Sequence, residues 1–297
     1  MAHEIDEVVE RLLGTSANSI EPLHGGITNA NYKVQLSDEQ VVVVRIPGKN
    51  TALLGIDRIC EVAANRLAAE IGVGPEVIAA EEETGCLVTR FIEARSVPMA
   101  ELGTEPTLGD VISRLRHVHT AGSIPGSFDH FAVIRRYHEL ASTRGVDEPF
   151  DYETASAVLD EIERLRPFRP EVLGHNDLLN ANLLNDGSIR ILDWEYAAMS
   201  DPFFDLANFS VNNELGHERD EAILSHYFGR VDESYLAVLA LMKLVSELRE
   251  AMWGVAQLAI SDLDFDFAGY ASERGRRFET LLDGIDMQAL ARAAPPR

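Results

Sequence analysis

Four side chains within one short segment could together handle a magnesium-bound nucleotide. The segment from residue 173 to residue 196, LGHNDLLNANLLNDGSIRILDWEY, contains His175, Asp177, Asn182 and Asp193. Phosphoryl transfer needs a base that orients the acceptor hydroxyl and ligands that hold a metal ion against the phosphates. Asp177 suits the base, and Asn182 and Asp193 offer the hard oxygen donors that Mg²⁺ prefers. This spacing predicts a kinase that uses MgATP.

A hairpin must bring the two metal-binding candidates together. Residues 183–184 and 189–192 flank the turn sequence Asn-Asp-Gly-Ser, which predicts two short strands that return Asp193 toward Asn182. Each candidate alone is more typical of a turn, a cap or the core. The four residues combined with the hairpin favour the kinase interpretation.

The rest of the chain predicts an α+β fold with two lobes. The region from Ile20 to about Arg90 is mostly strand-like and interrupted by one helix, whereas the chain after Pro98 has mainly helical periodicity. We therefore expect a small sheet-rich lobe over residues 1–92, a larger helical lobe over residues 93–297, and a nucleotide cleft between them. The expected strands are 32–35, 41–46 and 87–91, and the expected helices are 56–72, 108–119, 154–165 and 234–260.

Two features of the first lobe could bind phosphate. Gly25, Gly26, Thr28 and Asn29 lie between two expected strands, where glycines let backbone amides approach a polyphosphate. A tight turn explains the same glycines equally well, because no complete G-x-G-x-x-G is present.

Arg45 ends an apolar strand, at the place where kinases usually carry a phosphate-binding lysine. Its guanidinium can contact phosphate oxygens with two donors. Glu61, in the following helix, could pair with Arg45 and fix its position.

Composition limits the partners of the chain. The net charge of -23 opposes binding to nucleic acid and to anionic membranes. No apolar run approaches the ~18 residues that span a bilayer, and the N-terminus lacks a signal-peptide core, so we expect a cytoplasmic protein without membrane insertion. Cys60 and Cys86 are expected to be reduced packing residues. His117 and His119 could suggest a metal site, but a spacing of two points helical side chains apart, so we expect surface histidines instead.

The sequence resembles a known family at several separate places. The segments HNDLLNANLL, ILDWEYA and DPFFDLANF are similar to the choline and ethanolamine kinase family, within the wider group that includes the aminoglycoside phosphotransferases. The segments HGGITNANYKV, VVVVRIPG and LDFDFAGYASERGRRF resemble its bacterial branch. The resemblance runs from about Ile20 to Phe278. It implies a protein-kinase-like fold and transfer of the ATP γ-phosphate to the hydroxyl of a small amino alcohol.

The resemblance also implies roles for matching residues. Asp177 would be the catalytic base, Asn182 and Asp193 would bind Mg²⁺, Arg45 would contact the ATP phosphates, and Glu61 would hold Arg45.

The backbone at Phe91, Ile92 and Glu93 would meet the adenine ring.

The acceptor site departs from the better-known members of the family. The resemblance places Trp253 against the ammonium group, where its ring attracts a cation, and Glu250 lies one helical turn earlier on the same face. Trp253 could equally pack the core. Asn212 and Asn213 stand where the family pattern leads toward an acidic residue and an aromatic, and a second tryptophan is missing after Trp253.

Several functions therefore remain open. The leading hypothesis is an ATP- and Mg²⁺-dependent kinase for choline or ethanolamine. A kinase of the same fold for thiamine, an aminoglycoside or an amino sugar is the nearest alternative, and a noncatalytic nucleotide-binding pseudokinase is a further one. The oligomeric state is also open, with a homodimer among the alternatives.

Overall fold

The computed structural model describes residues 2–23 and 28–294. The chain forms two units, of which the first comprises residues 1–97 and 181–196, and the second comprises residues 98–180 and 197–297. The segment with the four candidate residues is thereby divided between the units. Asp177 belongs to the second unit, whereas Asn182 and Asp193 belong to the first. The boundary expected near residue 92 and the nucleotide cleft stay predictions.

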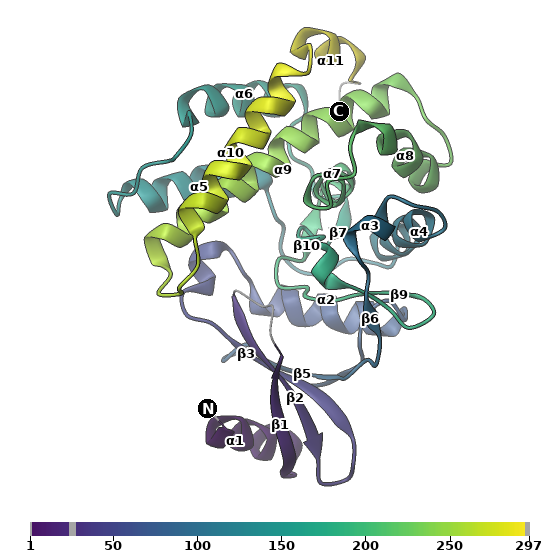
Figure 1. The fold of residues 1–297 in the computed structure, drawn as a ribbon, viewed down its shortest axis with the longest axis vertical. Helices are drawn as coiled ribbons and strands as arrows, with labels where there is room; N and C mark the ends of the chain where they lie inside the picture. Colours follow the sequence, from purple (N-terminus) through teal and green to yellow (C-terminus); the bar gives the residue numbers. More distant parts are fainter. Residues whose placement is uncertain (1, 24–27, 295–297) are drawn as a thin grey trace. The chain divides into compact units, whose positions relative to one another are not determined.

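The first unit is built on an antiparallel sheet with strand order β1-β2-β3-β5-β4 (Figure 1). Val42 and Val44 of the third strand are fully buried, as expected for one apolar face of an alternating strand. The strands expected at 32–35, 41–46 and 87–91 are confirmed. The strands are β1 (Ala17–Leu23), β2 (Asn29–Leu36), β3 (Val41–Pro47), β4 (Val77–Glu81) and β5 (Cys86–Arg90).

Two helices and one short 3-10 turn complete this sheet region. Helix α1 (Ala2–Leu13) buries Ile5 and Val9 in the same core as the sheet valines. Helix α2 (Arg58–Glu70) begins where Asp57 accepts hydrogen bonds from the backbone N–H groups of Ile59 at 2.9 Å and Cys60 at 3.1 Å. A 3-10 turn, η1 (Thr51–Leu54), precedes this helix.

The predicted hairpin is confirmed, and it packs with the first unit. Strands β8 (Leu183–Asn185) and β9 (Ile189–Ile191) pair antiparallel, and β6 (Arg95–Ser96) pairs with the other edge of β8. The N–H of Ile191 donates to the carbonyl oxygen of Val73 at 3.0 Å. A 3-10 turn, η2 (Asn180–Asn182), leads into the hairpin.

The second unit is mainly helical. Helix α9 (Glu233–Ile260) is buried over most of its length and packs on α5, α7 and α10, which makes it the central element of this unit (Figure 1). Such burial explains why its sequence is apolar almost all round. The short strands β7 (Val172–Gly174) and β10 (Ala198–Ser200) pair beside the loop that carries Asp177.

The helices expected at 108–119, 154–165 and 234–260 are confirmed. The other helical elements described in this unit are α3 (Met99–Leu102), α4 (Thr107–His119), α5 (His130–Ser142), α6 (Tyr152–Leu165), α7 (Pro202–Asn212), η3 (His217–Arg219), α8 (Asp220–Phe228), α10 (Phe267–Asp283) and α11 (Met287–Ala293).

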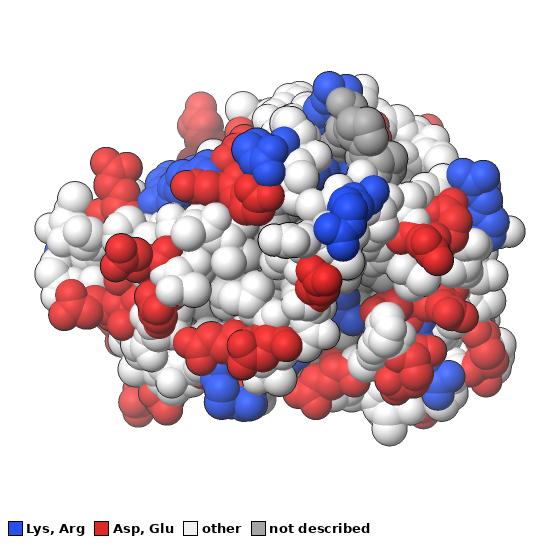
Figure 2. Space-filling view, turned by 90° about the horizontal axis from the view of Figure 1, so that it is seen from above, with Lys and Arg blue, Asp and Glu red and all other residues white. Residues whose placement is uncertain are grey.

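The surface and the cysteines agree with the expectations from composition. Figure 2 shows acidic side chains spread over one face, with basic side chains scattered among them. No helix among residues 2–23 and 28–294 is long and apolar enough to cross a bilayer. Cys60 and Cys86 are buried and free, as predicted.

Candidate active site

The loop that carries Asp177 is held by the first turn of helix α7. The backbone N–H groups of His175 and Asn176 donate to the two carboxylate oxygens of Asp205, each at 2.7 Å. The N–H of Leu178 donates to Asn208 Oδ1 at 2.6 Å, one turn further along the same helix. Both sides of Asp177 are therefore anchored to one rigid element.

A third anchor comes from helix α9. Arg249, which is 1% exposed, donates through Nη2 to the carbonyl oxygen of Asn176, and the same atom lies 3.5 Å from Asp177 Oδ1. The N–H of Asp177 donates to His175 Nδ1 at 3.2 Å. This bond places the proton of a neutral imidazole on Nε2.

Asp205 is kept ionised by a buried histidine. Burial by itself raises the pKa of this carboxyl group, but the hydrogen bond and charge of His119, together with the backbone N–H of His175, lower it below its ordinary value. His119 Nε2 lies 2.9 Å from Asp205 Oδ2, and its Nδ1 lies 2.6 Å from the hydroxyl oxygen of Tyr227.

The surface location expected for His119 is therefore wrong. The residue lies at the last turn of α4, where its ring points inward to Asp205 and not to solvent. His117 is exposed as predicted, because two helical residues at this spacing point in different directions.

In the first unit, the hairpin brings the two metal-binding candidates together. The N–H of Leu192 donates to the carbonyl oxygen of Asn182 at 2.9 Å, at the open end of the strand pair. Asp193, the next residue, has a left-handed backbone with φ 62°. A non-glycine residue in this region often lies at a functional site. Its carboxylate oxygen Oδ1 is 3.8 Å from Arg45 Nη1.

The predicted pair of Arg45 and Glu61 is present and buried. Arg45 Nη1 contacts Glu61 Oε1 directly, and Glu61 is fully buried. Burial by itself lowers the pKa of the guanidinium, but the charge and hydrogen bond of Glu61 outweigh it, so the pKa of Arg45 is raised. Within the described residues, Arg45 Nε and Nη2 donate to no protein acceptor. These two donors fit a forked contact with phosphate oxygens.

A second arginine shares Glu61, and this residue was not predicted. Arg58 Nη1 donates to Glu61 Oε2 at 2.6 Å and lies 3.9 Å from Glu195 Oε2. The spacing of three residues between Arg58 and Glu61 at a helix start was the available signal.

Asn29 lies beside Glu195, and its contact with phosphate stays a prediction. Its Nδ2 donates to Glu195 Oε2 at 2.8 Å, while Oδ1 is buried without a partner among the described residues. Burial, together with the charge of Asp193, raises the pKa of Glu195 to about 8. Glu195 lies two residues after Asp193, and it was not predicted from the sequence as a site residue.

The remaining nucleotide candidates are only partly described. Gly25 and Gly26 lie outside the described residues. The carbonyl oxygen of Thr28 accepts from the N–H of Gly48 at 3.0 Å, an approach so close that a Cβ on Gly48 would meet that oxygen at 2.2 Å.

The segment expected to contact adenine leaves the sheet after β5. The N–H of Phe91 donates to the carbonyl oxygen of Val41 at 3.1 Å, Ile92 is half-buried and Glu93 is exposed. Their contact with adenine stays a prediction.

The donor set fits magnesium that arrives with a nucleotide. Among residues 2–23 and 28–294, no three His, Cys, Asp or Glu side chains form a group able to enclose a metal ion. Mg²⁺ held mainly by phosphates and water needs only one or two protein ligands. The side chains of Asn182 and Asp193 supply that number.

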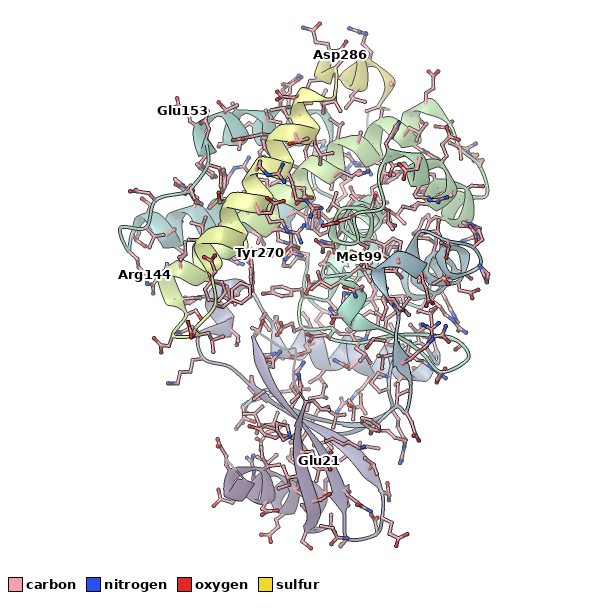
Figure 3. The ribbon with its side chains drawn as sticks, viewed as in Figure 1. Glu21, Met99, Arg144, Glu153, Tyr270 and Asp286 are labelled. Atoms are coloured by element: carbon pink, nitrogen blue, oxygen red, sulfur yellow. The ribbon has the colours of Figure 1, made fainter. Side chains whose placement is uncertain are left out.

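The acceptor candidates Glu250 and Trp253 lie together on α9, beside the first turns of α10. Glu250 is buried, and its carboxylate oxygen Oε1 lies 3.0 Å from Arg249 Nη2. The hydroxyl of Tyr270 donates to Glu250 Oε2 at 2.7 Å, and Figure 3 labels this tyrosine on α10. The ring of Trp253 meets the rings of Tyr270 and Phe267 edge-on at 5.5 Å and 5.9 Å.

Glu250 remains ionised despite its burial. Burial by itself raises the pKa of this carboxyl group, but the charges of Arg249 and Arg274 and the hydrogen bond from Tyr270 lower it overall. The second unit thus brings the predicted base and the predicted acceptor residues together, because Arg249 contacts both Asp177 and Glu250.

Comparisons with known proteins find similar families, relatives and structures. A model of the phosphotransferase enzyme family matches residues 19–241. A probable ethanolamine kinase from Arabidopsis thaliana is 29% identical over 296 residues, which cover 87% of this chain and 78% of the relative.

Three solved structures match nearly the whole chain. A choline/ethanolamine kinase family protein from Mesorhizobium loti has a TM-score of 0.82 and 28% identity, and the match covers 98% of each chain. The choline kinase LicA from Streptococcus pneumoniae has a TM-score of 0.80 and 26% identity, with 95% of this chain and 99% of LicA covered. A LicA structure in complex with AMP also matches, at 26% identity. These matches confirm the predicted fold class.

Proposed function

Because this chain belongs to the phosphotransferase enzyme family, we propose that it transfers the γ-phosphate of ATP to the hydroxyl of a small amino alcohol, choline or ethanolamine. The observation that carries this proposal is the contact of Arg249 with both Asp177 and Glu250. A proton acceptor and a buried anion beside aromatic rings suit a substrate that has a hydroxyl and a cationic amine. The matched structures described as choline/ethanolamine kinase and choline kinase support the same acceptor class.

The first unit supplies the nucleotide half of the proposal. Arg45 offers two guanidinium donors to phosphate oxygens, and Glu61 holds the guanidinium in place. Asn182 and Asp193 would hold Mg²⁺, which neutralises charge on the phosphates when bound. Use of ATP is supported by the kinase relatives and by the LicA complex with AMP.

The second unit supplies the acceptor half. Asp177 takes the proton of the acceptor hydroxyl while the oxygen of that hydroxyl attacks the γ-phosphorus. The bond to the β,γ-bridging oxygen breaks, and ADP leaves with that electron pair. The loop contacts with Asp205 and Asn208 keep the Asp177 carboxylate in position, so little reorganisation is needed during transfer.

The cationic end of the acceptor is assigned to the rings of Trp253 and Tyr270. A ring face attracts an ammonium group by ~0.5–2 kcal/mol, with the larger values where the cation is desolvated. The negative charge of the nearby Glu250 also attracts the ammonium group over a longer distance. We place the activity in the cytoplasm, where MgATP is available, and a homodimer stays a prediction that light scattering after size exclusion would test.

A screen for ADP release tests the proposal. The purified protein is incubated with MgATP and choline, ethanolamine, thiamine or an amino sugar, with a no-acceptor reaction as background. We expect choline or ethanolamine to raise ADP release far above background, and chelation of Mg²⁺ to abolish it. The proposal would be overturned if no amino alcohol raised the rate of ADP release above the no-acceptor background. Turnover only with an amino sugar or thiamine would assign the chain to that acceptor class.

A further inference from the structure

Two buried amide oxygens at the end of helix α7 have no role in the function proposed above. Asn212 and Asn213 end helix α7, and both are at least nine-tenths buried. Their Oδ1 atoms accept no hydrogen bond from any residue that the structure describes. A buried acceptor without a donor costs about 1–3 kcal/mol, so such an atom in a native protein calls for a donor from elsewhere.

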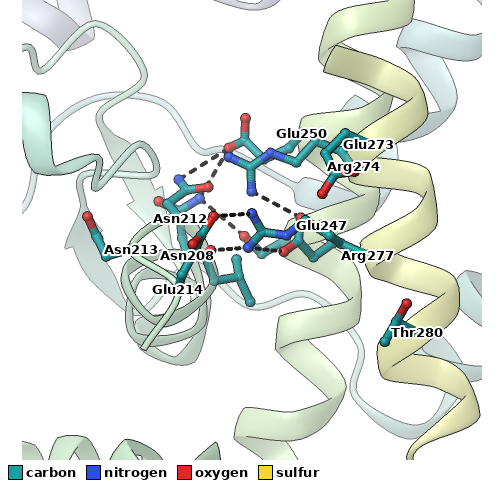
Figure 4. Close-up of polar contacts among 12 residues, drawn as sticks. Asn208, Asn212, Asn213, Glu214, Glu247, Glu250, Glu273, Arg274, Arg277 and Thr280 are labelled. Carbon is teal, nitrogen blue, oxygen red and sulfur yellow. Dashed lines mark hydrogen bonds and ion pairs between the residues drawn. The ribbon is translucent and has the colours of Figure 1, made fainter. Parts of the chain in front are cut away.

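The orientation of the Asn212 amide is set by its neighbour. Nδ2 of Asn212 lies 3.5 Å from Glu250 Oε1, on the side where a carboxylate requires a donor. A flipped amide would place Oδ1 against that anion. The oxygen therefore faces away from Glu250, and Figure 4 shows the amides of Asn208 and Asn212 directed at the Glu250 carboxylate.

Glu250 itself has little capacity left for a hydrogen-bonding ligand. Its Oε1 already lies near donors of Arg249 at 3.0 Å, Asn208 at 3.3 Å and Asn212 at 3.5 Å. Its Oε2 accepts from Tyr270. Each carboxylate oxygen has two lone pairs, so the three donors saturate Oε1, whereas Oε2 keeps one acceptor position. Glu250 therefore attracts an ammonium group mainly by its charge, and the oxygen of Asn212, which has no donor among the described residues, offers a further acceptor for its N–H groups.

Asn213 is a poorer candidate for that hydrogen bond. Its Nδ2 donates to the carbonyl oxygens of Leu178 and Phe209 at 2.9 Å and 2.8 Å, which ties the side chain to the catalytic loop. In Figure 4 it lies apart from the contacts around Glu250. Neighbouring residues on a helix also point in different directions, so the two oxygens do not serve one ligand atom.

We propose that Asn212 Oδ1 accepts a hydrogen bond from the ammonium group of the acceptor, so that the enzyme prefers amino alcohols that carry an N–H, such as ethanolamine, over choline. This inference rests on the proposed function. A quaternary ammonium has no N–H and leaves the Asn212 oxygen without a donor. Sites built around a hydrogen bond discriminate strongly against ligands that lack the donor.

A methylation series tests the proposal with the native protein. Ethanolamine, N-methylethanolamine, N,N-dimethylethanolamine and choline carry three, two, one and no N–H groups when protonated. Because one acceptor oxygen needs one donor, we expect kcat/KM to fall by at least about tenfold at the last methylation and less at the earlier steps. An even decline, or choline equal to or better than dimethylethanolamine, would overturn the proposal.

A variant pair assigns the effect to Asn212. Asn212→Leu keeps the volume but removes the oxygen, so we expect the ethanolamine-to-choline ratio of kcat/KM to fall to within about threefold of one. Ser210→Ala is the matched control, because Ser210 is buried on the same helix and its hydroxyl donates to Asp220 at 3.3 Å, away from Glu250. The control should keep the wild-type ratio.

The outcomes separate this inference from the proposed function. Turnover of amino alcohols with a ratio unchanged in Asn212→Leu overturns the role of Asn212 and leaves the kinase activity standing. No turnover of any amino alcohol overturns both. Melting temperatures establish that the variants fold, and if Asn212→Leu does not, the methylation series with the native protein decides.

Discussion

Asp177 is the residue on which proton transfer depends in the proposed reaction. Asp177→Asn keeps the shape of the side chain but removes the basic carboxylate, so kcat should fall by two to four orders of magnitude, the typical contribution of a general base. The KM for MgATP should stay within about twofold, because phosphate and metal contacts are assigned to other residues. Steady-state kinetics with varied ATP measure both constants. A variant with near-native kcat would remove Asp177 from the role of base.

Arg45 is assigned to the nucleotide phosphates. Arg45→Ala should raise the KM for ATP and destabilise the fold by about 3–5 kcal/mol, because Glu61 is left as a buried charge with only Arg58 as its partner. Arg45→Lys keeps the charge but loses the forked geometry, so it should restore stability more fully than ATP affinity. Thermal unfolding and ATP titrations separate these effects. Identical ATP constants in all three proteins would contradict the phosphate assignment.

Trp253 is only 8% exposed and packs against two other rings, so alanine would disturb both folding and binding. Trp253→Leu retains apolar bulk while it removes the aromatic face. The KM for the amino alcohol should rise about 2- to 30-fold, which corresponds to ~0.5–2 kcal/mol of lost cation attraction. The KM for MgATP should not change. An acceptor KM equal to that of the native protein would place Trp253 in the core only.

Helix α7 connects the catalytic loop to a histidine on another helix, and this connection depends on pH. The pKa of Asp205 lies below its ordinary value of 3.8, so the ionised side chain contributes stability above that pH. The contribution disappears as the pH falls through the lowered pKa. We expect Asp205→Asn to be less stable than the native protein at pH 5 to 7, with a gap in unfolding free energy that narrows below about pH 3.8. Denaturant unfolding at several pH values measures this gap, and a constant gap would contradict the assignment.

Elements with local patterns could be predicted from the sequence. The hairpin β8–β9 follows from two short, mainly apolar segments around a glycine turn, and α9 follows from 28 residues of helical pattern without a proline. The pair of Arg45 and Glu61 could be predicted because Arg45 ends a strand where kinases carry a phosphate-binding residue, and Glu61 lies in the helix that follows. The resemblance supported this expectation, and the contact is present.

Long-range partners could not be predicted in the same way. Asp205 holds the backbone of His175, 30 residues away, and His119, 86 residues away. Nothing in the local pattern of His119 distinguishes an inward ring from a surface one. Arg249 contacts both Asp177 and Glu250 because of how α9 packs against its neighbours. Composition and periodicity do not specify that packing.

At the scale of the molecule, the first unit contains two separate stretches of the chain. Leu183, Ile191 and Trp194 of the hairpin are fully buried there. A fragment of residues 98–297 would carry this hairpin without the segment 1–97, so we expect it to expose apolar surface and to bind a hydrophobic dye.

A matched fragment tests this expectation. Replacing residues 181–196 of the 98–297 fragment by a Gly/Ser linker removes the exposed hairpin and should lower dye binding, and co-expression of residues 1–97 with the original fragment should do the same. Size exclusion and dye fluorescence measure the outcome. A monomeric original fragment that binds no dye would show that the hairpin does not need the first unit.

The four donors around Glu250 have a consequence for how acceptor preference could change over evolution. A substitution at Arg249 or Glu250 removes one member of a buried ion pair, and most such changes would be lost through misfolding before a new substrate could select them. Neutral neighbours such as Asn212 do not carry this penalty. Families that share this scaffold should therefore diversify at uncharged positions around a fixed set of charged side chains. Laboratory libraries directed at residue 212 should return more active variants than libraries directed at residues 249 or 250.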